Sequence, residues 1–373
     1  MLKGKYTNPK VLLPEIKEMT ADGKIIEKQK NTLGRGMFFA SFMRPGRVSL
    51  FLYGAKRVYM LQYLQTGKGV WLMRIWLKRI LMGLGALLLA LVLCATVVLG
   101  WYFPRYLDRK EMVTLSPDRQ SITMMSCNLR CLTPLDLGKR SWFYRADLLV
   151  DDIAAQAPGI IGFQESTRWQ YDYMTDVLSG YGSVIDYRDD TLFSEGCPIF
   201  YKEDLYELVD KGSFWLSETP EVMSKDWGAA CYRICSYVIL TDRSSGKDFV
   251  VFNTHLDHVS DEARIKGIAV VLDKIAQFGG LPSVIMGDFN ALENSKTYTA
   301  VTEHFDDARY IALETSDSYT YQNWGDAASF RRIDYFMISK TGFRVSRYAV
   351  LQPVHDGVYA SDHCPIVLSL ALE

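Results

Sequence analysis

The 373-residue sequence lacks the cysteine spacing of a structural metal site. It has seven cysteines, and no two of them form a CxxC pair, which argues against a zinc ribbon or a thioredoxin-like redox site. Histidine is also scarce, with five in the whole chain. There is no internal repeat and no low-complexity segment, which excludes a solenoid and a biased linker.

A further absence is more informative, because residues 80–103 contain no charged side chain. A helix over this segment would rise about 36 Å, and the hydrocarbon core of a bilayer is roughly 30 Å thick. We therefore expect a retained transmembrane helix at 80–103, which makes the membrane a partner of this chain. The alternatives are a buried core helix, which normally carries a polar stripe, and a cleaved signal peptide, whose apolar segment is shorter.

The charges divide at this segment. Residues 1–79 hold 16 Lys and Arg against 4 Asp and Glu, whereas residues 80–373 hold 26 against 39. Since basic residues favour the cytoplasmic side, the pattern predicts a single-pass membrane protein with its N-terminus in the cytoplasm and its acidic domain outside it. An acidic domain also argues against nonspecific binding to nucleic acid.

Four parts follow from these patterns. Residues 1–79 form a basic N-terminal region, either partly disordered or an upstream extension of the native protein. Residues 80–103 form the membrane span, 104–120 a juxtamembrane linker, and 121–373 a large domain.

Within the large domain, short apolar runs alternate with amphipathic stretches. Strands are expected at 121–128, 160–164, 183–187, 198–201, 212–216, 235–241, 249–254, 283–287, 332–338, 344–351 and 366–371. Helices are expected at 141–156 and at 261–277, the second with Ser260 as its N-cap. This set predicts an α/β (α+β) domain in which two packed β-sheets are flanked by helices.

Polar residues follow several of these strands. Glu165 ends an apolar strand, where a buried carboxylate is costly unless a cation meets it, so Glu165 is a candidate metal ligand. Asp288 and Asn290 follow another strand, and at positions i and i+2 they would share one face. A carboxylate there can accept a proton from attacking water while the amide holds phosphate. The alternative is an Asx turn that closes the strand.

Histidines add to this set. His255 ends a strand, and Asp257 would share its face if the strand continued. His363 follows Asp362 directly. Asp334 interrupts an apolar strand and needs a partner when buried, and a histidine is the natural one.

In their order along the chain, these motifs resemble the endonuclease/exonuclease/phosphatase superfamily over about 121–373. The resemblance implies a four-layer sandwich of two mostly antiparallel β-sheets between helices, and hydrolysis of phosphate esters with Mg²⁺ or Mn²⁺. It implies metal-binding roles for Asn128, Glu165 and Asp362, and catalytic roles for His255, Asp288, Asn290, Asp334 and His363.

The segment around His255 narrows the resemblance. A Thr-His-Leu sequence there is similar to DNase I, sphingomyelinases, phosphatases and deadenylases, whereas exonuclease III-type enzymes usually have an Asn-centred segment. The longer run 254–260, with 214–220, looks like a bacterial branch near the deadenylase and nocturnin sequences.

The sequence thus predicts a membrane-anchored, metal-dependent phosphoesterase acting on a phosphodiester, with a lipid, small-molecule or nucleic-acid substrate. A magnesium-dependent nuclease on DNA or RNA is the alternative, and an inactive binding module is a third. Asp257, Arg264 and Trp215 are candidate substrate contacts, although Arg264 would also fit a solvated helix charge and Trp215 core packing. The sequence indicates no protein partner.

Overall fold

The computed structural model describes residues 18–19, 25–26, 43–44, 47–48, 67–107 and 121–373. Most of the basic region 1–79 and most of the linker 104–120 lie outside these residues. The chain divides into two compact units, Met1–Val92 and Leu93–Glu373. In the first unit, β1 (Glu18–Met19) pairs with β2 (Ile25–Ile26), and β3 (Met43–Arg44) pairs with β4 (Arg47–Val48).

The charge-free segment lies within one helix, α2 (Gly67–Leu107), which extends beyond the predicted 80–103 at both ends. The extensions contain Lys, Arg, Leu and Met, which are good helix formers. Within α2, residues Trp71–Val97 are long and apolar enough to cross a membrane, and none of them is buried. The alternative of a buried core helix therefore does not fit the described part of the chain.

The domain of residues 121–373 is built on two sheets. The first has seven strands in the order β16-β18-β21-β5-β6-β10-β8. These strands are β5 (Ile122–Asn128), β6 (Ile160–Gln164), β8 (Tyr181–Val184), β10 (Ile199–Lys202), β16 (Glu314–Thr315), β18 (Phe343–Val350) and β21 (Ile366–Leu372).

The second sheet has six strands in the order β11-β12-β13-β14-β17-β15. These are β11 (Tyr206–Trp215), β12 (Ile234–Asp242), β13 (Lys247–His255), β14 (Ser283–Asp288), β15 (Phe305–Asp307) and β17 (Asp334–Ser339). Two short pairs lie outside both sheets, β7 (Ser166–Thr167) with β9 (Glu195–Gly196) and β19 (Val354–His355) with β20 (Val358–Tyr359).

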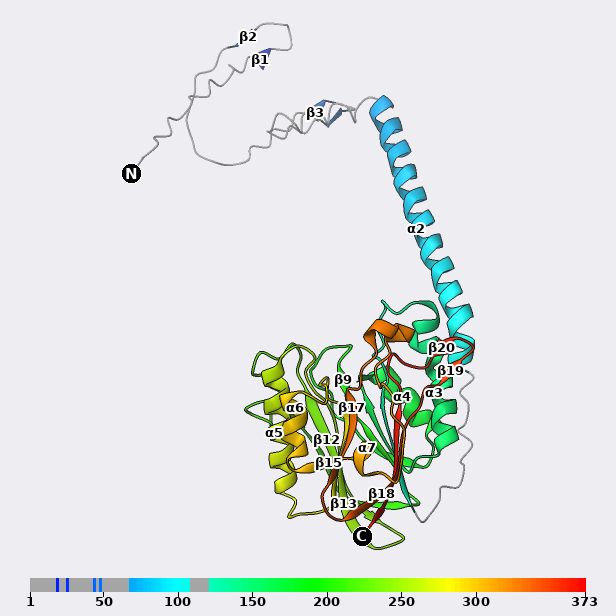
Figure 1. Cartoon of the computed structure of the whole chain (residues 1–373). Coiled ribbons are helices and arrows are strands. Elements are labelled where there is room, and N and C mark those ends of the chain that lie inside the picture. Colours follow the sequence, from blue (N-terminus) through cyan, green and yellow to red (C-terminus); the bar gives the residue numbers. More distant parts are fainter. Residues whose placement is uncertain (1–17, 20–24, 27–42, 45–46, 49–66, 108–120) are drawn as a thin grey trace, which may run out of the picture. The chain divides into compact units, whose positions relative to one another are not determined.

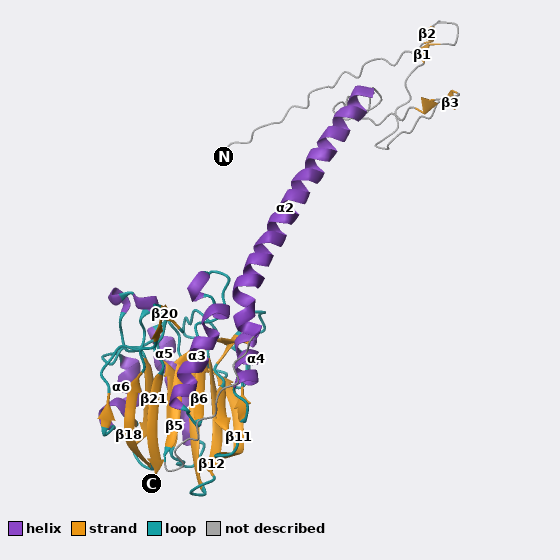
Figure 2. Cartoon of the chain, turned by 90° about the vertical axis from the view of Figure 1, so that its right-hand side faces the viewer, coloured by secondary structure: helices purple, strands orange, loops and turns teal. Residues whose placement is uncertain are grey.

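Helices cover the outer faces of the sheets, as Figure 1 shows with α5 and α6 on one side and α3 and α4 on the other. The helices are α3 (Trp142–Gln156), α4 (Arg168–Val177), α5 (Asp261–Ala276), α6 (Lys296–Thr302) and α7 (Ala308–Ile311), with 3₁₀ turns η1 (Gly138–Arg140), η2 (Asn323–Gly325) and η3 (Ala327–Ser329). Figure 2 shows the strands of the domain running side by side. Three apolar cores fill the layers, one between the sheets and one under each helix pair. The predicted four-layer sandwich is confirmed.

All the predicted strands and helices are present, and most of them begin or end at a slightly different residue. The strand predicted at 183–187 is β8 at Tyr181–Val184, and the one predicted at 212–216 begins earlier, as β11 at Tyr206–Trp215. The helix α5 begins as predicted, because the Ser260 hydroxyl accepts a hydrogen bond from the Ala263 N–H. The sequence reading missed α4, although Thr167 and Gln170 form a capping box at its start.

Parallel pairing brings the ends of four strands to one edge of the domain. In the first sheet β5 and β6 run parallel, with Asn128 opposite Gln164. In the second sheet β13 and β14 run parallel, with His255 opposite Asp288. Gly287 makes this second pairing possible, because a Cβ there would lie 1.9 Å from the Thr254 carbonyl oxygen.

One buried arginine holds the loops at this edge. Arg145 on α3 is fully buried and donates to the carbonyl oxygens of Arg140, Leu129, Ala360 and Arg130, at 2.5 to 3.0 Å. Three of these carbonyls, those of Leu129, Arg130 and Ala360, lie directly beside Asn128 or Ser361. The guanidinium therefore ties the end of β5 to the loop before β21.

Replacing Arg145 with Met should destabilise the domain by about 3 kcal/mol, because the change leaves several buried carbonyl oxygens without donors. The control is Arg344→Met at an exposed position on β18, which should change the stability by less than about 0.5 kcal/mol. Urea unfolding followed by circular dichroism measures both. Equal midpoints for the two variants would contradict this role for Arg145.

Candidate active site

Backbone turns aim two site residues inward. Glu165 directly follows β6 with φ +57°, and Asn290 lies just after β14 with φ +48°. Non-glycine residues rarely adopt this left-handed conformation, and such strain is concentrated at functional sites. Asn290 therefore does not share a strand face with Asp288 as expected, because β14 ends at Asp288.

The side-chain amide of Asn128 connects the two sheets at the site. Asn128, fully buried at the end of β5, donates from Nδ2 to Glu165 Oε1 at 3.2 Å and to Asp288 Oδ2 at 3.1 Å. Its Oδ1 accepts a hydrogen bond from the Arg130 N–H. Asn128 thus fixes the positions of the two carboxylates, and its own oxygen is engaged elsewhere.

Glu165 is held as an anion. Its Oε2 accepts a hydrogen bond of 2.8 Å from the Cys131 N–H. Burial opposes ionisation, but this bond, the charge of His363 and that of Arg130 together lower the pKa of the Glu165 carboxyl.

For Asp288, the effects that oppose ionisation of the carboxyl group outweigh those that favour it. Burial, followed by the negative charges of Asp334 and Glu165, raises the pKa of the Asp288 carboxyl to about 7. Its Oδ1 accepts from the Asn290 N–H at 2.8 Å, and its Oδ2 lies 3.4 Å from His255 Nε2 and 3.7 Å from His363 Nε2. This carboxylate stands at the centre of the site.

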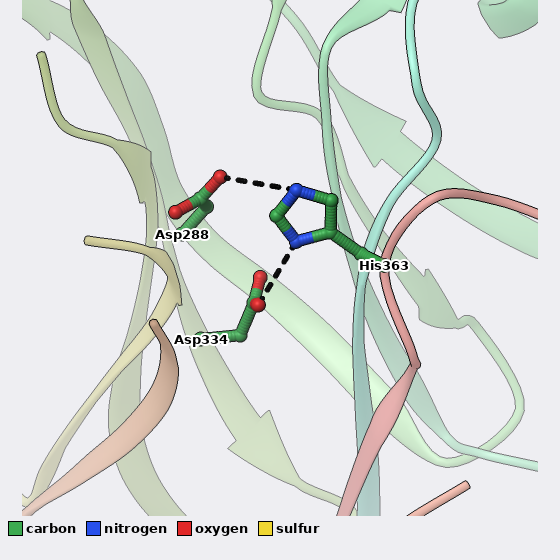
Figure 3. Close-up of side chains that lie close together, drawn as sticks. All are labelled: Asp288, Asp334 and His363. Atoms are coloured by element: carbon green, nitrogen blue, oxygen red, sulfur yellow. Dashed lines mark hydrogen bonds and ion pairs between the residues drawn. The ribbon is translucent and has the colours of Figure 1, made fainter. Parts of the chain in front are cut away.

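His363 lies between two carboxylates, as Figure 3 shows. Its Nδ1 donates to Asp334 Oδ2 at 2.9 Å, and its Nε2 faces Asp288. Burial disfavours the charged imidazole, but Asp334 and Asp288 outweigh it and raise the pKa of His363 to about 10. Asp334 is itself fixed, because its N–H donates to the Thr320 hydroxyl.

His255 is the electrostatic counterpart of His363. Burial and the positive charges of Arg233 and Arg188 hold the pKa of His255 well below its usual range, so its imidazole is neutral. Its Nε2 accepts from Asn290 Nδ2 at 2.9 Å. One histidine of the pair is therefore charged at neutral pH and the other is not.

Asp362 is buried beside these groups. Burial raises the pKa of its carboxyl, and the charge of Glu165 acts in the same direction. Its Oδ2 lies 3.9 Å from an Arg130 guanidinium nitrogen. Asp362 thus adds a further carboxylate to the group formed by Glu165, Asp288 and Asp334.

The three candidate substrate contacts lie apart from this group. The Asp257 carboxylate accepts from the N–H groups of Ala230, Cys231, Val259 and Ser260, so it organises two loops. Arg264 is buried and donates to the Asp257 carbonyl oxygen and to Asp261, so the solvated alternative is wrong. The half-buried Trp215 donates its indole N–H to the Arg188 carbonyl oxygen and lines a pocket of about 390 Å³.

Sequence reasoning missed three charged residues next to Glu165. Arg188 and Glu195 pair through two hydrogen bonds of 2.7 and 2.8 Å, and both line a small pocket together with Arg233, Glu165 and His255. Burial and the charge of Glu165 raise the pKa of Glu195 to about 7. The buried Nε atoms of Arg188 and Arg233 have no hydrogen-bond partner. No local pattern indicated them, because each arginine lies in an irregular segment outside the strands.

Comparison with known proteins decides the family. The family model described as endonuclease/exonuclease/phosphatase matches residues 125–363. The chain belongs to the endonuclease/exonuclease/phosphatase family. Members of this family hydrolyse phosphate esters with divalent metals, and this chain is a metal-dependent phosphoesterase of that kind.

Solved structures of the family support the assignment. A family protein from Bacteroides vulgatus is 30% identical and covers 68% of this chain and 99% of its own, with a TM-score of 0.65. A mannosyl-6-phosphatase from Bacteroides thetaiotaomicron is 33% identical over 67% of this chain and 99% of its own, with a TM-score of 0.62. The catalytic domain of human nocturnin, at 20% identity and a TM-score of 0.54, shares the fold.

Relatives in sequence are more distant. An uncharacterised protein of Acanthamoeba polyphaga mimivirus is 26% identical over 61% of this chain and 91% of its own length. The Ccr4 exoribonuclease subunit of Mycosarcoma maydis is 25% identical over 42% of this chain, but the match spans only 31% of that protein.

The donor groups of the site fit a divalent cation. Asp288 and Asp362 supply buried carboxylate oxygens and Glu165 supplies half-buried ones, and Mg²⁺ and Mn²⁺ prefer such ligands. Ligand atoms of Asp288, Asp334 and His363 also lie within 4.8 Å of one another. In this second group the hydrogen bond between His363 and Asp334 engages one atom of each residue, so the Glu165 side fits an oxygen-loving ion better.

The pH dependence of stability tests the charge crowding at Asp288. Its pKa is raised above the unfolded value, so its contribution to stability is complete below about pH 4 and is lost as the pH rises through about 7. Without metal, Asp288→Asn should melt higher than the parent chain at pH 8, and the difference should be much smaller at pH 5. Mg²⁺ or Mn²⁺ should raise the parent's melting temperature more at pH 8 than at pH 5.

Differential scanning fluorimetry at pH 5 and at pH 8, each with a chelator or with metal, measures these melting temperatures. Asp273→Asn on the exposed face of α5 is the matched control and should follow the parent chain. A parent and an Asp288→Asn variant that melt together at both pH values would exclude the proposed charge crowding.

Proposed function

We propose that this chain is a membrane-anchored phosphodiesterase that uses Mg²⁺ or Mn²⁺, and that Asn128, Glu165, Asp288, Asp334 and His363 carry its chemistry. The observation on which the proposal rests is the pair of hydrogen bonds from Asn128 to Glu165 and Asp288. Those bonds hold a carboxylate from each sheet within reach of one phosphate.

Glu165 would bind the metal ion, with Asp362 beside it and Asn128 fixing the Glu165 carboxylate. A bound divalent ion neutralises phosphate charge and lowers the pKa of water. The hydrogen bond from the Cys131 N–H keeps Glu165 ionised and ready for this role.

Asp288 would accept the proton of the attacking water, because its pKa near 7 is matched to a general base at neutral pH. His363, held charged by Asp334, lies 3.7 Å from the same carboxylate and can donate to a phosphate oxygen. This assigns Asp334 the role of positioning His363 and supporting its charge.

His255 and Asn290 would bind the phosphate group through neutral hydrogen bonds. The low pKa of His255 supports this role over protonation of the leaving group. Arg188 and Arg233 provide positive charge beside Glu165, and each has a buried Nε without a hydrogen-bond partner. These arginines are better placed than Arg264, whose guanidinium is engaged by Asp257 and Asp261.

A phosphatase acting on a sugar phosphate is the second candidate. It is favoured by the 33% identity with the mannosyl-6-phosphatase. The Ccr4 exoribonuclease subunits among the relatives keep RNA among the substrates to be tested. The acidic surface of residues 121–373, with 22 Lys and Arg against 36 Asp and Glu, disfavours a long polyanion.

Activity of the purified full chain tests the proposal. With Mg²⁺ or Mn²⁺ it should hydrolyse bis-nitrophenyl phosphate, and a chelator should abolish the activity. Glu165→Gln and Asp288→Asn should each lower kcat by a factor of about 10² to 10⁴, with the fold retained by circular dichroism. Glu314→Gln, exposed on the edge strand β16, should match the parent chain.

The choice of substrate separates the candidates. Faster turnover of mannose 6-phosphate than of any diester would favour the phosphatase, and hydrolysis of RNA would favour the nuclease. Full activity in both site variants would refute the assigned roles.

For the anchor, we propose that α2 spans the membrane with the N-terminus in the cytoplasm, as the excess of basic residues before it indicates. A protease added to intact cells should then release a fragment beginning near residue 121, and membranes washed at pH 11 should retain the undigested chain. Digestion only after cell lysis would show the opposite orientation, with the domain in the cytoplasm. Extraction of the undigested chain at pH 11 would rule out a membrane span.

A further inference from the structure

The exposed apolar side chains of the domain gather at the edge that carries the site. Nine of its fourteen exposed large apolar residues lie in loops at that edge, and a tenth, Val354, lies in the short strand β19. Six of them are named here the apolar rim: Leu135, Leu137, Leu192, Phe193, Val222 and Val259. Each of the six is between 50% and 85% exposed.

Sheet pairing places these loops at one edge. The loop of Leu135 and Leu137 follows β5 directly after Asn128, and the loop of Val259 follows β13 after His255. The loop that contains Val222 leads into β12, whose first residues pair with the end of β13. The loop of Leu192 and Phe193 follows β8, which runs parallel to β6 through their shared antiparallel neighbour β10.

Contacts join the loops of the rim in two pairs. The Leu132 N–H donates to Gln170 on α4, and the ring of Trp169 on the same helix lies 5.3 Å from that of Phe193. The Ser260 hydroxyl donates to the Trp227 carbonyl oxygen, which joins the loop of Val259 to that of Val222.

We propose that the apolar rim rests on the surface of a zwitterionic phospholipid bilayer, so that the site acts on phosphate esters of lipid headgroups. The substrate part of this inference rests on the proposed function, whereas the docking part does not. Apolar tips separated by polar residues suit a fluid interface, because lipids adapt to each tip and need no complementary shape.

The length of the chain permits this docking. Residues 108–120 join α2 to the first strand, and thirteen residues reach at most about 45 Å. The domain begins with β5 at the edge opposite the site, and a strand of seven residues is about 24 Å long. The linker is therefore long enough to pass the domain and let the site edge face the membrane that α2 crosses.

Charge selects the kind of lipid. The domain carries 22 Lys and Arg against 36 Asp and Glu, so an anionic surface repels it. Binding should therefore be driven by apolar contact with neutral headgroups, and it should not increase when anionic lipid is added.

The test uses residues 121–373, which fold independently. The three apolar cores lie wholly within this segment, and solved relatives match about two thirds of this chain with 97% or more of their own length. This fragment should sediment with phosphatidylcholine vesicles at millimolar lipid. The variant Leu135→Ser/Val222→Ser should partition about tenfold more weakly, because two inserting side chains are lost.

A matched pair supplies the control. Leu313 and Val209 are 77% and 55% exposed, close to the 85% and 57% of Leu135 and Val222, but they lie away from the site edge. Leu313→Ser/Val209→Ser should bind vesicles as the parent fragment does. Both double variants should hydrolyse bis-nitrophenyl phosphate at the parent rate.

Several outcomes would overturn the proposal. These are a parent fragment that stays in solution at all lipid concentrations, equal binding by the two double variants, or binding that requires anionic lipid. A fragment that self-associates through the rim, shown by sedimentation velocity, would assign the rim to a second copy. A parent fragment that binds vesicles but does not hydrolyse phosphate esters would instead refute the proposed function, and the proposed docking surface would remain supported.

Hydrogen exchange on the full chain gives an independent measurement. In phosphatidylcholine nanodiscs the amides of residues 131–138, 190–193, 220–224 and 257–260 should exchange more slowly than in the free fragment. Unchanged exchange in all four segments would contradict docking in the anchored protein.

Discussion

The site depends on one buried amide that connects two sheets. Asn128 ends a strand of the first sheet, and its Nδ2 donates both to Glu165 of that sheet and to Asp288 of the second. The hydrogen bonds can form only because β5 with β6 and β13 with β14 run parallel and end at the same edge. The network of Arg145 fixes the loops on either side, so the position of Asn128 is set by buried polar contacts.

This arrangement concentrates negative charge in a place with little water. Glu165, Asp288, Asp334 and Asp362 share the site. Burial and neighbouring charges raise the pKa of Asp288 and Asp362, whereas hydrogen bonds and positive neighbours lower that of Glu165. A divalent cation relieves this repulsion, which couples metal binding to stability as well as to catalysis. Neighbouring charges also give the two histidines different protonation states, because Asp334 keeps His363 charged while Arg233 and Arg188 help keep His255 neutral.

Some parts of the structure could be read from local sequence and others could not. The strand that ends directly before Glu165 and the N-cap at Ser260 are local features, and both appear where they were expected. The need for glycine at position 287 is not a local feature, because its missing side chain leaves room for the Thr254 carbonyl oxygen of the neighbouring strand. Asp257 follows the end of β13, so it organises loops and does not share a face with His255. These differences arise because strand ends depend on partners far away in the chain.

The sequence by itself determined the family, the apolar segment within α2 and the kinds of side chain at the site, because periodicity and motif order are local properties. Only the tertiary structure decided how Asn128 is used, which arginines lie beside Glu165 and which histidine carries the charge. Each of those depends on distances between residues separated by tens to hundreds of positions, and no local pattern encodes such distances. The position of the apolar rim at the site edge also depends on the tertiary structure, since its loops meet only when both sheets have formed.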